Sequence, residues 1–262
     1  MSAPENSTEL LAPEVRRLPI PSGVELLWLF ESDRDLKQHP VYAQAKAGDA
    51  AAAVQLISDL ALASIYAERD RFGQDAIFVA PFAREAAGDN AIPQVLAEVA
   101  AMVCGAHADQ QVVQVTRVYH TGADPMERLA LRAAFEGQVQ AGGTYVLVDD
   151  VVSLGGTLAE LAHFIQSKGG MVKAIFVLVN AGRNKAICPE RRQLKILHER
   201  YGHEFEKIFG ICVDALTANE ASYLVGFRSV DEIRNRLAKA KQEVDIRLRS
   251  KGIEGVFGPQ DS

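Results

Sequence analysis

Two adjacent carboxylates followed by a glycine turn are the residues of this chain best suited to chemistry. Asp149 and Asp150 end the apolar run that begins at Tyr145, and the small-residue turn 153–157 follows shortly after. An amphipathic pattern then begins at Leu158. Glycine lets the backbone approach an anion, and the start of a helix presents free N–H groups. Carboxylates accept hydrogen bonds from sugar hydroxyls, so this order of residues indicates a site for a phosphorylated sugar.

The stretch from Val146 to Thr157 resembles the phosphoribosyl-pyrophosphate (PRPP) signature of type I phosphoribosyltransferases. That signature joins a short apolar run, two acidic residues, two apolar residues and a loop rich in Ser, Thr and Gly. The resemblance implies that Asp149 and Asp150 hold the ribose 2′ and 3′ hydroxyls, directly or through a metal-bound water, which also makes them the candidate metal ligands. The implied 5′-phosphate loop consists of Ser153, Leu154, Gly155, Gly156 and Thr157.

The chain departs from this signature at two positions. Leu154 stands where the family usually has Thr or Ala, which keeps the backbone donors and removes a hydroxyl contact to phosphate. Ser153 stands where some members carry an acidic catalytic base, so no base is assigned there. Thr157 is expected to cap the helix that follows.

Two further segments are candidates for holding pyrophosphate. In the family the loop after the first strand has this role, and its candidates here are Arg84, Gly88 and Asn90; an ordinary loop that caps the next helix is the alternative. Arg128 and Arg132 are four residues apart, so a helix would place both guanidinium groups on one side. Such a pair could clamp pyrophosphate through bidentate hydrogen bonds, and an exposed amphipathic helix is the alternative.

Apolar runs that alternate with amphipathic segments predict an α/β fold, a Rossmann-like parallel sheet of about five strands flanked by helices. Buried parallel strands read as near-continuous apolar runs, and ligands bind at the edge where their carboxyl ends meet. The expected strands are 76–80, 112–118, 145–149, 172–179 and 208–213. The expected helices are 49–68, 92–102, 158–168, one within 190–207, one opened by a capping box of Thr217 and Glu220, and 230–249.

Four segments are expected along the chain. Residues 1–17 are expected to be a disordered tail, and residues 18–70 an N-terminal extension that contains the apolar run 24–30. Residues 71–215 are the expected phosphoribosyltransferase core, and 216–262 a C-terminal helical extension. In the family a variable hood built from terminal segments selects the acceptor. Here the hood would come from the N-terminal extension, alone or with the C-terminal one, and no motif in either identifies the acceptor.

Composition narrows the classes of partner. The net charge of −6 and the pI of about 5.6 argue against a nucleic-acid partner. No apolar stretch approaches the ~20 residues of a membrane span, and the N-terminus lacks the apolar segment of a secretory signal. The three cysteines are widely spaced and form no metal motif, which fits free thiols in a reducing cytoplasm. We therefore expect a cytoplasmic protein without membrane contact, and the resemblance adds a homodimer.

The resemblance implies an enzyme, a pentosyltransferase that moves the phosphoribosyl group of PRPP to a nitrogenous base or related small acceptor and releases pyrophosphate. Mg²⁺ is the implied cofactor, because it binds through substrate phosphates and one or two carboxylates. The catalytic candidates are Asp149 and Asp150, which fix the sugar, and Arg128 and Arg132, which neutralise the leaving pyrophosphate. A regulator of the same fold that binds PRPP or a nucleotide without turnover is the alternative, since fold does not decide function.

Overall fold

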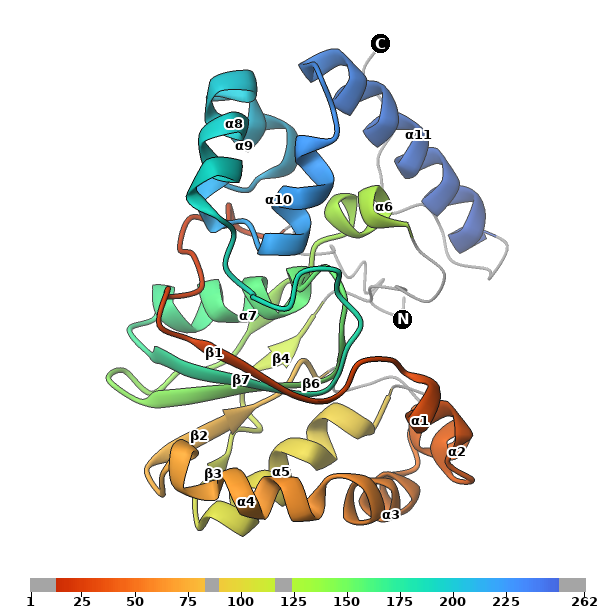
Figure 1. Cartoon of the computed structure of the whole chain (residues 1–262), viewed down its shortest axis with the longest axis vertical. Coiled ribbons are helices and arrows are strands. Elements are labelled where there is room, and N and C mark those ends of the chain that lie inside the picture. Colours follow the sequence, from red (N-terminus) through yellow and green to blue (C-terminus); the bar gives the residue numbers. More distant parts are fainter. Residues whose placement is uncertain (1–12, 83–89, 116–123, 250–262) are drawn as a thin grey trace, which may run out of the picture.

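The centre of the molecule is a five-stranded parallel sheet with the strand order β1-β7-β6-β2-β3 (Figure 1). The structure is a computed structural model that describes residues 13–82, 90–115 and 124–249. The strands of this sheet are β1 (Glu25–Phe30), β2 (Ala76–Val79), β3 (His107–Ala108), β6 (Thr144–Val152) and β7 (Met171–Asn180). The predicted α/β fold with about five parallel strands flanked by helices is confirmed.

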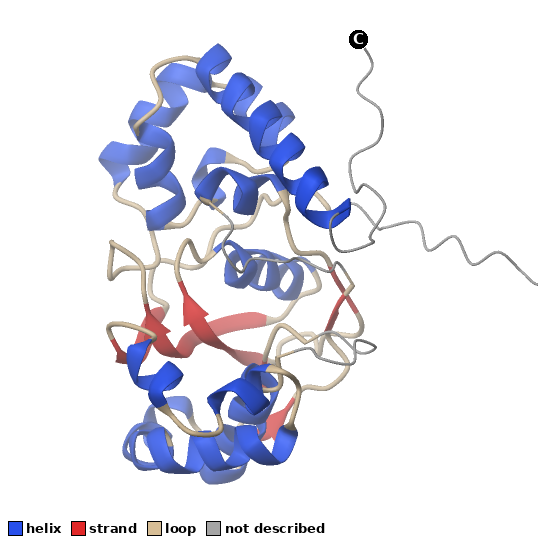
Figure 2. Ribbon diagram, turned by 90° about the vertical axis from the view of Figure 1, so that its right-hand side faces the viewer, coloured by secondary structure: helices blue, strands red, loops and turns tan. Residues whose placement is uncertain are grey.

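Helices cover both faces of the sheet (Figures 1 and 2). On one face lie α3 (Ala50–Leu60), α4 (Leu62–Phe72) and α5 (Ile92–Cys104), and on the other lies α7 (Gly156–Ser167). Each face has its own apolar cluster, because neighbouring residues of a strand point to opposite sides. On the α3–α5 side, Phe72 packs edge-on against Phe78 and Phe176, which ties α4 to β2 and β7.

A group of helices, here called the helical cap, packs beyond α7 and away from the sheet (Figure 1). It consists of α6 (Pro125–Ala130), α8 (Arg191–Tyr201), α9 (Glu204–Phe209), α10 (Ala218–Val225) and α11 (Val230–Arg249). These helices share a third apolar cluster, which the 3₁₀ turn Val213–Ala215 joins. The predicted capping box is confirmed, since Thr217 and Glu220 each accept the other's backbone N–H at the start of α10.

The order in which strands are added to the sheet reverses between β6 and β2. From β6 the sheet grows through β7 towards β1, and from β2 it grows through β3 in the opposite direction. The register of β2 ends where Val79 aligns with Leu147, so the last residues of β6 extend past its neighbour. Asp149 and Asp150 lie in this overhang at the carboxyl end of β6. Ligands of open α/β sheets bind at such a reversal of strand order.

The prediction of a strand over 112–118 in the parallel sheet was wrong for residues 112–115, and residues 116–118 lie outside the described part of the chain. After β3 the carboxylate of Asp109 accepts the N–H groups of Gln111 and Val112, and this turn carries the chain out of the sheet. The segment β4 (Val113–Gln114) instead pairs in antiparallel fashion with β5 (Phe135–Glu136).

The fifth strand of the sheet is β1 and not the predicted 208–213. Phe205 and Phe209 are four residues apart and face the third apolar cluster, so α9 forms there and ends at Gly210, whose φ is 63°. Ile211 makes one isolated parallel bridge with Arg16. The run 24–30, expected in an N-terminal extension, supplies β1 because β7 offers it a parallel edge.

Two other predictions about the N-terminal part need correction. The expected helix 49–68 is two helices, α3 and α4, which bend by 81° at the buried Ala61 so that both pack on α5. Residues 13–17 do not belong to a disordered tail, because Arg16 is fully buried; residues 1–12 lie outside the described residues. Within the described residues no single helix combines the length and apolar character of a membrane span, although the bent α3–α4 pair does so jointly.

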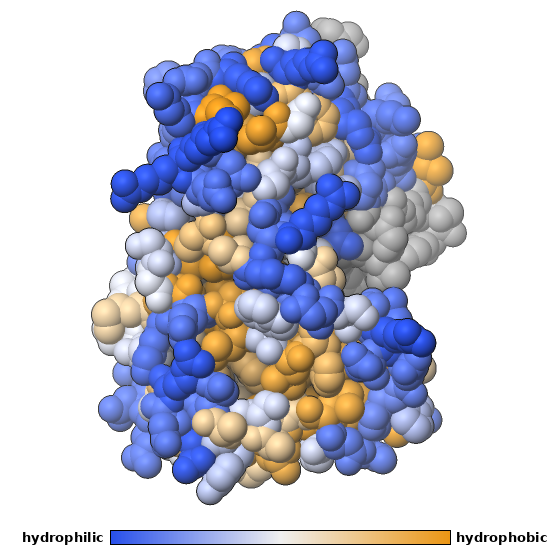
Figure 3. Space-filling view, viewed as in Figure 1, coloured by the Kyte–Doolittle hydropathy of each residue, from blue (hydrophilic) through white to orange (hydrophobic). Residues whose placement is uncertain are grey.

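Apolar side chains are exposed across the middle and lower right of the space-filling view, where Figure 1 places β1 and α3 (Figures 1 and 3). A groove of about 380 Å³ opens there between the edge strand β1 and α4. Leu27, Leu29 and Phe30 line it from β1, and Ser64 and Ala67 line it from α4. None of its lining residues belongs to the acidic pair or the glycine turn, so the groove is separate from the predicted site.

Candidate functional site

Asp150 is the centre of a compact polar cluster at the carboxyl end of β6. Only 5% of the residue is exposed. Its Oδ2 accepts hydrogen bonds from Lys46 Nζ at 2.6 Å and from Asn90 Nδ2 at 2.8 Å. Its Oδ1 accepts the N–H of Val151 at 2.8 Å. Both oxygens of this buried carboxylate are therefore satisfied within the protein, as buried charges require.

Lys46 ends the short helix α2 (Tyr42–Lys46), which together with α1 (Arg34–Gln38) lies beside the carboxyl edge of the sheet (Figure 1). Its side chain is 39% exposed, so the ammonium group reaches Asp150 from the solvent side. Burial by itself would lower the pKa of Lys46, but the charge of Asp150 and the hydrogen bond to it outweigh burial and raise that pKa. Lys46 therefore carries its charge at neutral pH.

Asp149 is the more exposed carboxylate of the pair. Its Oδ1 accepts the N–H of Asp150 at 2.8 Å. Desolvation and, after it, the adjacent charge of Asp150 raise the pKa of Asp149 well above its ordinary value. The pair thus joins a buried carboxylate with internal partners to a partly exposed neighbour that holds its proton more tightly than an ordinary aspartate.

The glycine turn leads directly from β6 into α7. Gly155 has a φ of 81° and is the N-cap of α7, a backbone conformation that favours glycine. The helix therefore begins at Gly156, and Thr157 lies inside its first turn, so the expected capping role of Thr157 was wrong. Gly155 is buried, whereas the other four residues of the turn are partly exposed. The first N–H groups of a helix have no intrahelical partner and attract anions.

Arg128 and Arg132 do not share one side of a helix. The helix α6 ends at Ala130, and Leu131 leaves the helical conformation with a ψ of 84°. Arg128 donates from Nη1 to the hydroxyl oxygen of Ser153 at 2.8 Å, which brings a guanidinium group to the first residue of the turn. Burial lowers the pKa of Arg128, and the neighbouring charge of Glu127 offsets part of this.

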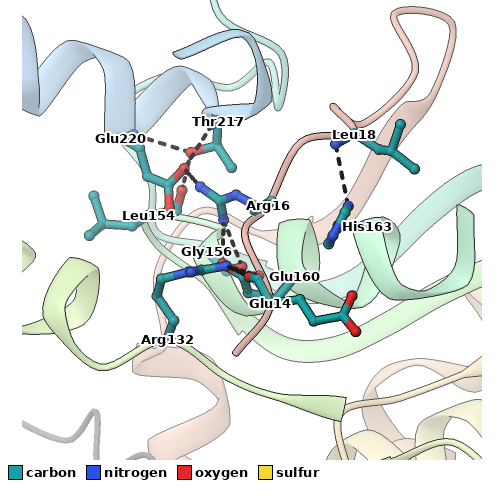
Figure 4. A network of polar contacts seen from close by, with 10 residues as sticks. All are labelled: Glu14, Arg16, Leu18, Arg132, Leu154, Gly156, Glu160, His163, Thr217 and Glu220. Carbon is teal, nitrogen blue, oxygen red and sulfur yellow. Dashed lines mark hydrogen bonds and ion pairs between the residues drawn. The ribbon is translucent and has the colours of Figure 1, made fainter. Parts of the chain in front are cut away.

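Arg132 lies in a buried ion-pair network with Glu160. It donates from Nε and Nη2 to the two carboxylate oxygens of Glu160 on α7, at 2.7 and 2.8 Å, and from Nη2 to the carbonyl of Glu14 at 2.6 Å (Figure 4). A bidentate pair of this kind fixes the guanidinium group. Arg132 is therefore bound to α7, whereas Arg128 is bound to Ser153 of the glycine turn.

Arg16 completes this network (Figure 4). Its Nη2 donates to Glu220 at 2.6 Å, and its Nη1 lies 3.3 Å from both Glu160 and the carbonyl of Gly156. The hydroxyl of Thr217 donates to the carbonyl of Leu154. The set Arg16, Arg132, Glu160 and Glu220, here called the buried cluster, thus attaches the glycine turn to the N-terminal segment and the helical cap.

The loop after β2 is only partly described. Arg84 and Gly88, two of its predicted pyrophosphate residues, lie outside the described residues. Asn90 is described and donates to Asp150, while its own Oδ1 accepts the N–H of Ile92 at 3.2 Å. Asn90 therefore belongs to the acidic pair's cluster and also helps to start α5.

Sequence reasoning missed Lys46 and Arg16. Lys46 is 104 residues from its partner Asp150, and Arg16 is 204 residues from Glu220. No local pattern marks either residue, because each takes its role from a contact that only the folded chain creates. The burial of Arg16 had one weak signal, the apolar and Pro-rich run that follows it.

The acidic pair does not fit a divalent metal ion in the arrangement described. Asp150 would have to release Lys46 or Asn90 before one of its oxygens could bind Mg²⁺. A second group of carboxylates, Asp124, Glu127 and Glu243, has ligand atoms within 4.8 Å of one another. Asp124 already has partners within the protein, since its carboxylate caps α6 and pairs with Arg236.

Comparison with known proteins adds two curated relatives. The chain is 36% identical over 219 residues to the protein TraN of Escherichia coli, an alignment that covers 81% of this chain and 49% of TraN. It is 35% identical over 133 residues to an uncharacterised protein of Haemophilus influenzae, covering 50% of this chain and 30% of that protein. The chain spans about half the length of TraN and less of the second relative. No family model matches the chain.

Among solved structures, similar chains include several phosphoribosyltransferases. An adenine phosphoribosyltransferase is 17% identical with a TM-score of 0.32, covering 48% of this chain and 69% of its own. The adenine phosphoribosyltransferase from Leishmania donovani is 15% identical with a TM-score of 0.34, and the alignment covers 64% of this chain and 72% of that enzyme. A hypoxanthine phosphoribosyltransferase from Staphylococcus aureus is 12% identical with a TM-score of 0.31, covering 50% and 69%. These TM-scores are too low to support any conclusion about this chain. The fold assignment therefore rests on the chain's own strand order and register.

Proposed function

We propose that this protein binds PRPP and transfers its phosphoribosyl group to a small nitrogenous acceptor. One observation carries the proposal: a carboxylate pair at the carboxyl end of β6 is followed directly by a glycine turn at the N-terminus of α7, beside the reversal of strand order. Carboxylates for sugar hydroxyls and N–H groups for a phosphate are the two features that a phosphorylated pentose requires. The resemblance of 146–157 to the PRPP signature points the same way.

In this proposal the partly exposed carboxylate of Asp149 accepts a hydrogen bond from a ribose hydroxyl, and the turn 153–157 holds the 5′-phosphate. The acceptor nitrogen forms a bond to C1 of the ribose while the bond from C1 to the pyrophosphate oxygen breaks. Pyrophosphate leaves with the bonding electrons, and the proton of the acceptor nitrogen passes to water. Arg128, beside the turn, is the guanidinium group placed to stabilise phosphate charge. Arg132 is assigned no direct role, because it is bound to Glu160.

Mg²⁺ would enter this reaction bound to the phosphates of PRPP. Mg²⁺ commonly binds through substrate phosphates with few protein ligands, and it keeps several of its waters. No step is assigned to a metal ion held by the acidic pair, because Asp150 already has internal donors on both oxygens.

Binding and turnover can be tested separately on the same preparation. Titration calorimetry with ribose 5-phosphate tests the pentose site, and pyrophosphate release from PRPP with a panel of nucleobases tests transfer. The double variant Asp149→Asn, Asp150→Asn should lose both signals while keeping its folded circular dichroism spectrum. The matched control is Asp70→Asn, whose side chain is 88% exposed and lies in a different element. Unchanged pyrophosphate release in the double variant would refute the proposal.

A second candidate is a regulator that binds PRPP or a nucleotide without turnover. It is favoured by Ser153, which stands where an acidic catalytic base would be expected and instead accepts a hydrogen bond from Arg128. Binding of PRPP without pyrophosphate release, for every base in the panel, would identify this candidate.

A further inference from the structure

We propose that Lys46 takes the place of a divalent metal ion at the acidic pair, so that this site binds the hydroxyls of a phosphorylated pentose without a metal. The inference builds on the proposed function and names the group that makes the site selective for a sugar. It follows from the disagreement between the metal site that the resemblance implies and the contacts that the structure places there.

The contacts at Asp150 leave a metal ion no ready position. Two donors, Lys46 Nζ at 2.6 Å and Asn90 Nδ2 at 2.8 Å, converge on one carboxylate oxygen. The backbone N–H of Val151 binds the other oxygen at 2.8 Å. With 5% of the residue exposed, Asp150 has little room for the hydrated shell that Mg²⁺ prefers to retain.

The charges around Asp150 also disfavour a metal ion at this position. A Lys ammonium at hydrogen-bond distance neutralises one of the two carboxylates, which removes much of the attraction that would draw in a dication. If Mg²⁺ displaced Lys46 from Asp150, the ammonium group would remain close to the metal and repel it. The ion pair and the metal therefore compete for the same carboxylate.

Lys46 retains the donors that a sugar requires. An ammonium group has three N–H donors, and the hydrogen bond to Asp150 uses one of them. The side chain is 39% exposed and lies close to the partly exposed Asp149, so a hydroxyl between them could accept from Lys46 and donate to Asp149. The short helix α2, within the segment 18–70 expected to provide the hood, thereby delivers a binding group to the site.

Ribose 5-phosphate is the probe that isolates this effect, because it has the hydroxyls and the phosphate of PRPP but no pyrophosphate to carry its own metal ion. Its dissociation constant would be measured by calorimetry in EDTA and again in millimolar Mg²⁺, for the unaltered protein, Lys46→Met and Lys46→Arg. Thermal unfolding would be recorded for each variant, to separate loss of binding from loss of fold.

For the unaltered protein we expect dissociation constants that agree within about threefold between the two conditions. Lys46→Met should bind about tenfold more weakly in EDTA and recover most of this loss in Mg²⁺, since the vacated carboxylate can then hold the ion. Lys46→Arg keeps the charge and should remain independent of Mg²⁺.

Two results would count against the inference in distinguishable ways. If the unaltered protein and Lys46→Met show the same strong requirement for Mg²⁺, Lys46 does not replace the metal, and the proposed function stands. If no variant binds ribose 5-phosphate in either condition, the pentose site is wrong, and both the proposed function and this inference fall.

Discussion

The two ion-pair clusters around the glycine turn use the same side-chain chemistry in opposite settings. The buried cluster encloses Arg16, Glu160 and Glu220 with side-chain exposures of 1%, 5% and 3%. At the acidic pair, Lys46 approaches from the solvent and its side chain is 39% exposed. An enclosed cluster cannot exchange a partner for a ligand without exposing an unpaired charge, whereas a half-open one can. The first therefore holds the turn in place, and the second is free to recognise a molecule.

The largest effect that tests this comparison is expected from Arg16→Met. The substitution leaves Glu220 without its cation in the interior and weakens the contact to Gly156, so we expect a loss of about 3–5 kcal/mol in the free energy of unfolding. Chemical denaturation measures it. The control is Arg17→Met, which removes an arginine with a 62% exposed side chain and should cost less than about 1 kcal/mol. Equal losses for the two variants would show that burial does not distinguish the clusters.

Gly156→Ala should have the next largest effect, because it joins the turn to the buried cluster. A Cβ at this position would lie 2.9 Å from Oε1 of Glu220, a carboxylate that Arg16 and Thr217 hold in place. We expect a loss of about 1–3 kcal/mol in unfolding free energy, together with weaker binding of ribose 5-phosphate. Gly23→Ala is the matched control, since a Cβ there meets nothing within 4 Å. Unchanged stability in Gly156→Ala would mean that the Glu220 carboxylate can move aside at little cost in free energy.

Asp149→Asn should stabilise the fold, by less than the two losses above. The folded-state pKa of Asp149 is raised, so ionisation of this group opposes folding as the pH rises from the unfolded-state pKa through the folded-state pKa. The gain from Asn is therefore present at pH 7 and disappears below the ordinary pKa of an aspartate, about 3.9. Chemical denaturation at pH 7 and at a pH below that ordinary pKa measures the change in unfolding free energy. The neighbouring Asp150→Asn should instead lower stability at pH 7, since it removes the partner of Lys46.

Lys46→Met is expected to change stability least, by less than about 1 kcal/mol, because its side chain is partly exposed and Asn90 and Val151 still bind Asp150. A small change in thermal stability together with a large change in the metal dependence of binding would show that Lys46 serves binding and not the fold. A loss of stability as large as that of Arg16→Met would place Lys46 with the buried cluster.

Much of the site's frame could be predicted because its signals are local. The apolar run before Asp149, the glycine turn and the amphipathic pattern of α7 are contiguous in the chain, and the structure places them in that order. The capping box of Thr217 and Glu220 is equally local. What failed depended on long-range contacts: β1 becomes a strand by pairing with β7, and Lys46 becomes a site residue by reaching Asp150.

The error over Arg132 has a different origin. The four-residue spacing from Arg128 places both groups on one side only if the helix continues, and α6 ends at Ala130. Spacing predicts a shared face for residues within one helix, and sequence defines the end of a short helix poorly. The buried Glu160 on α7 then fixes Arg132 elsewhere.

The position of β1 has a consequence for how the chain acquires its fold. Glu25 aligns with Ala174, so the strand made early in synthesis finds its neighbour only after β7 has emerged. Closing so long a loop is slow, and the apolar edge stays uncovered in the meantime, open to mispairing. The chain's single tryptophan, Trp28, lies on this strand. Its fluorescence would therefore report the arrival of β1 as a late phase of refolding, distinct from the earlier assembly of β2, β6 and β7.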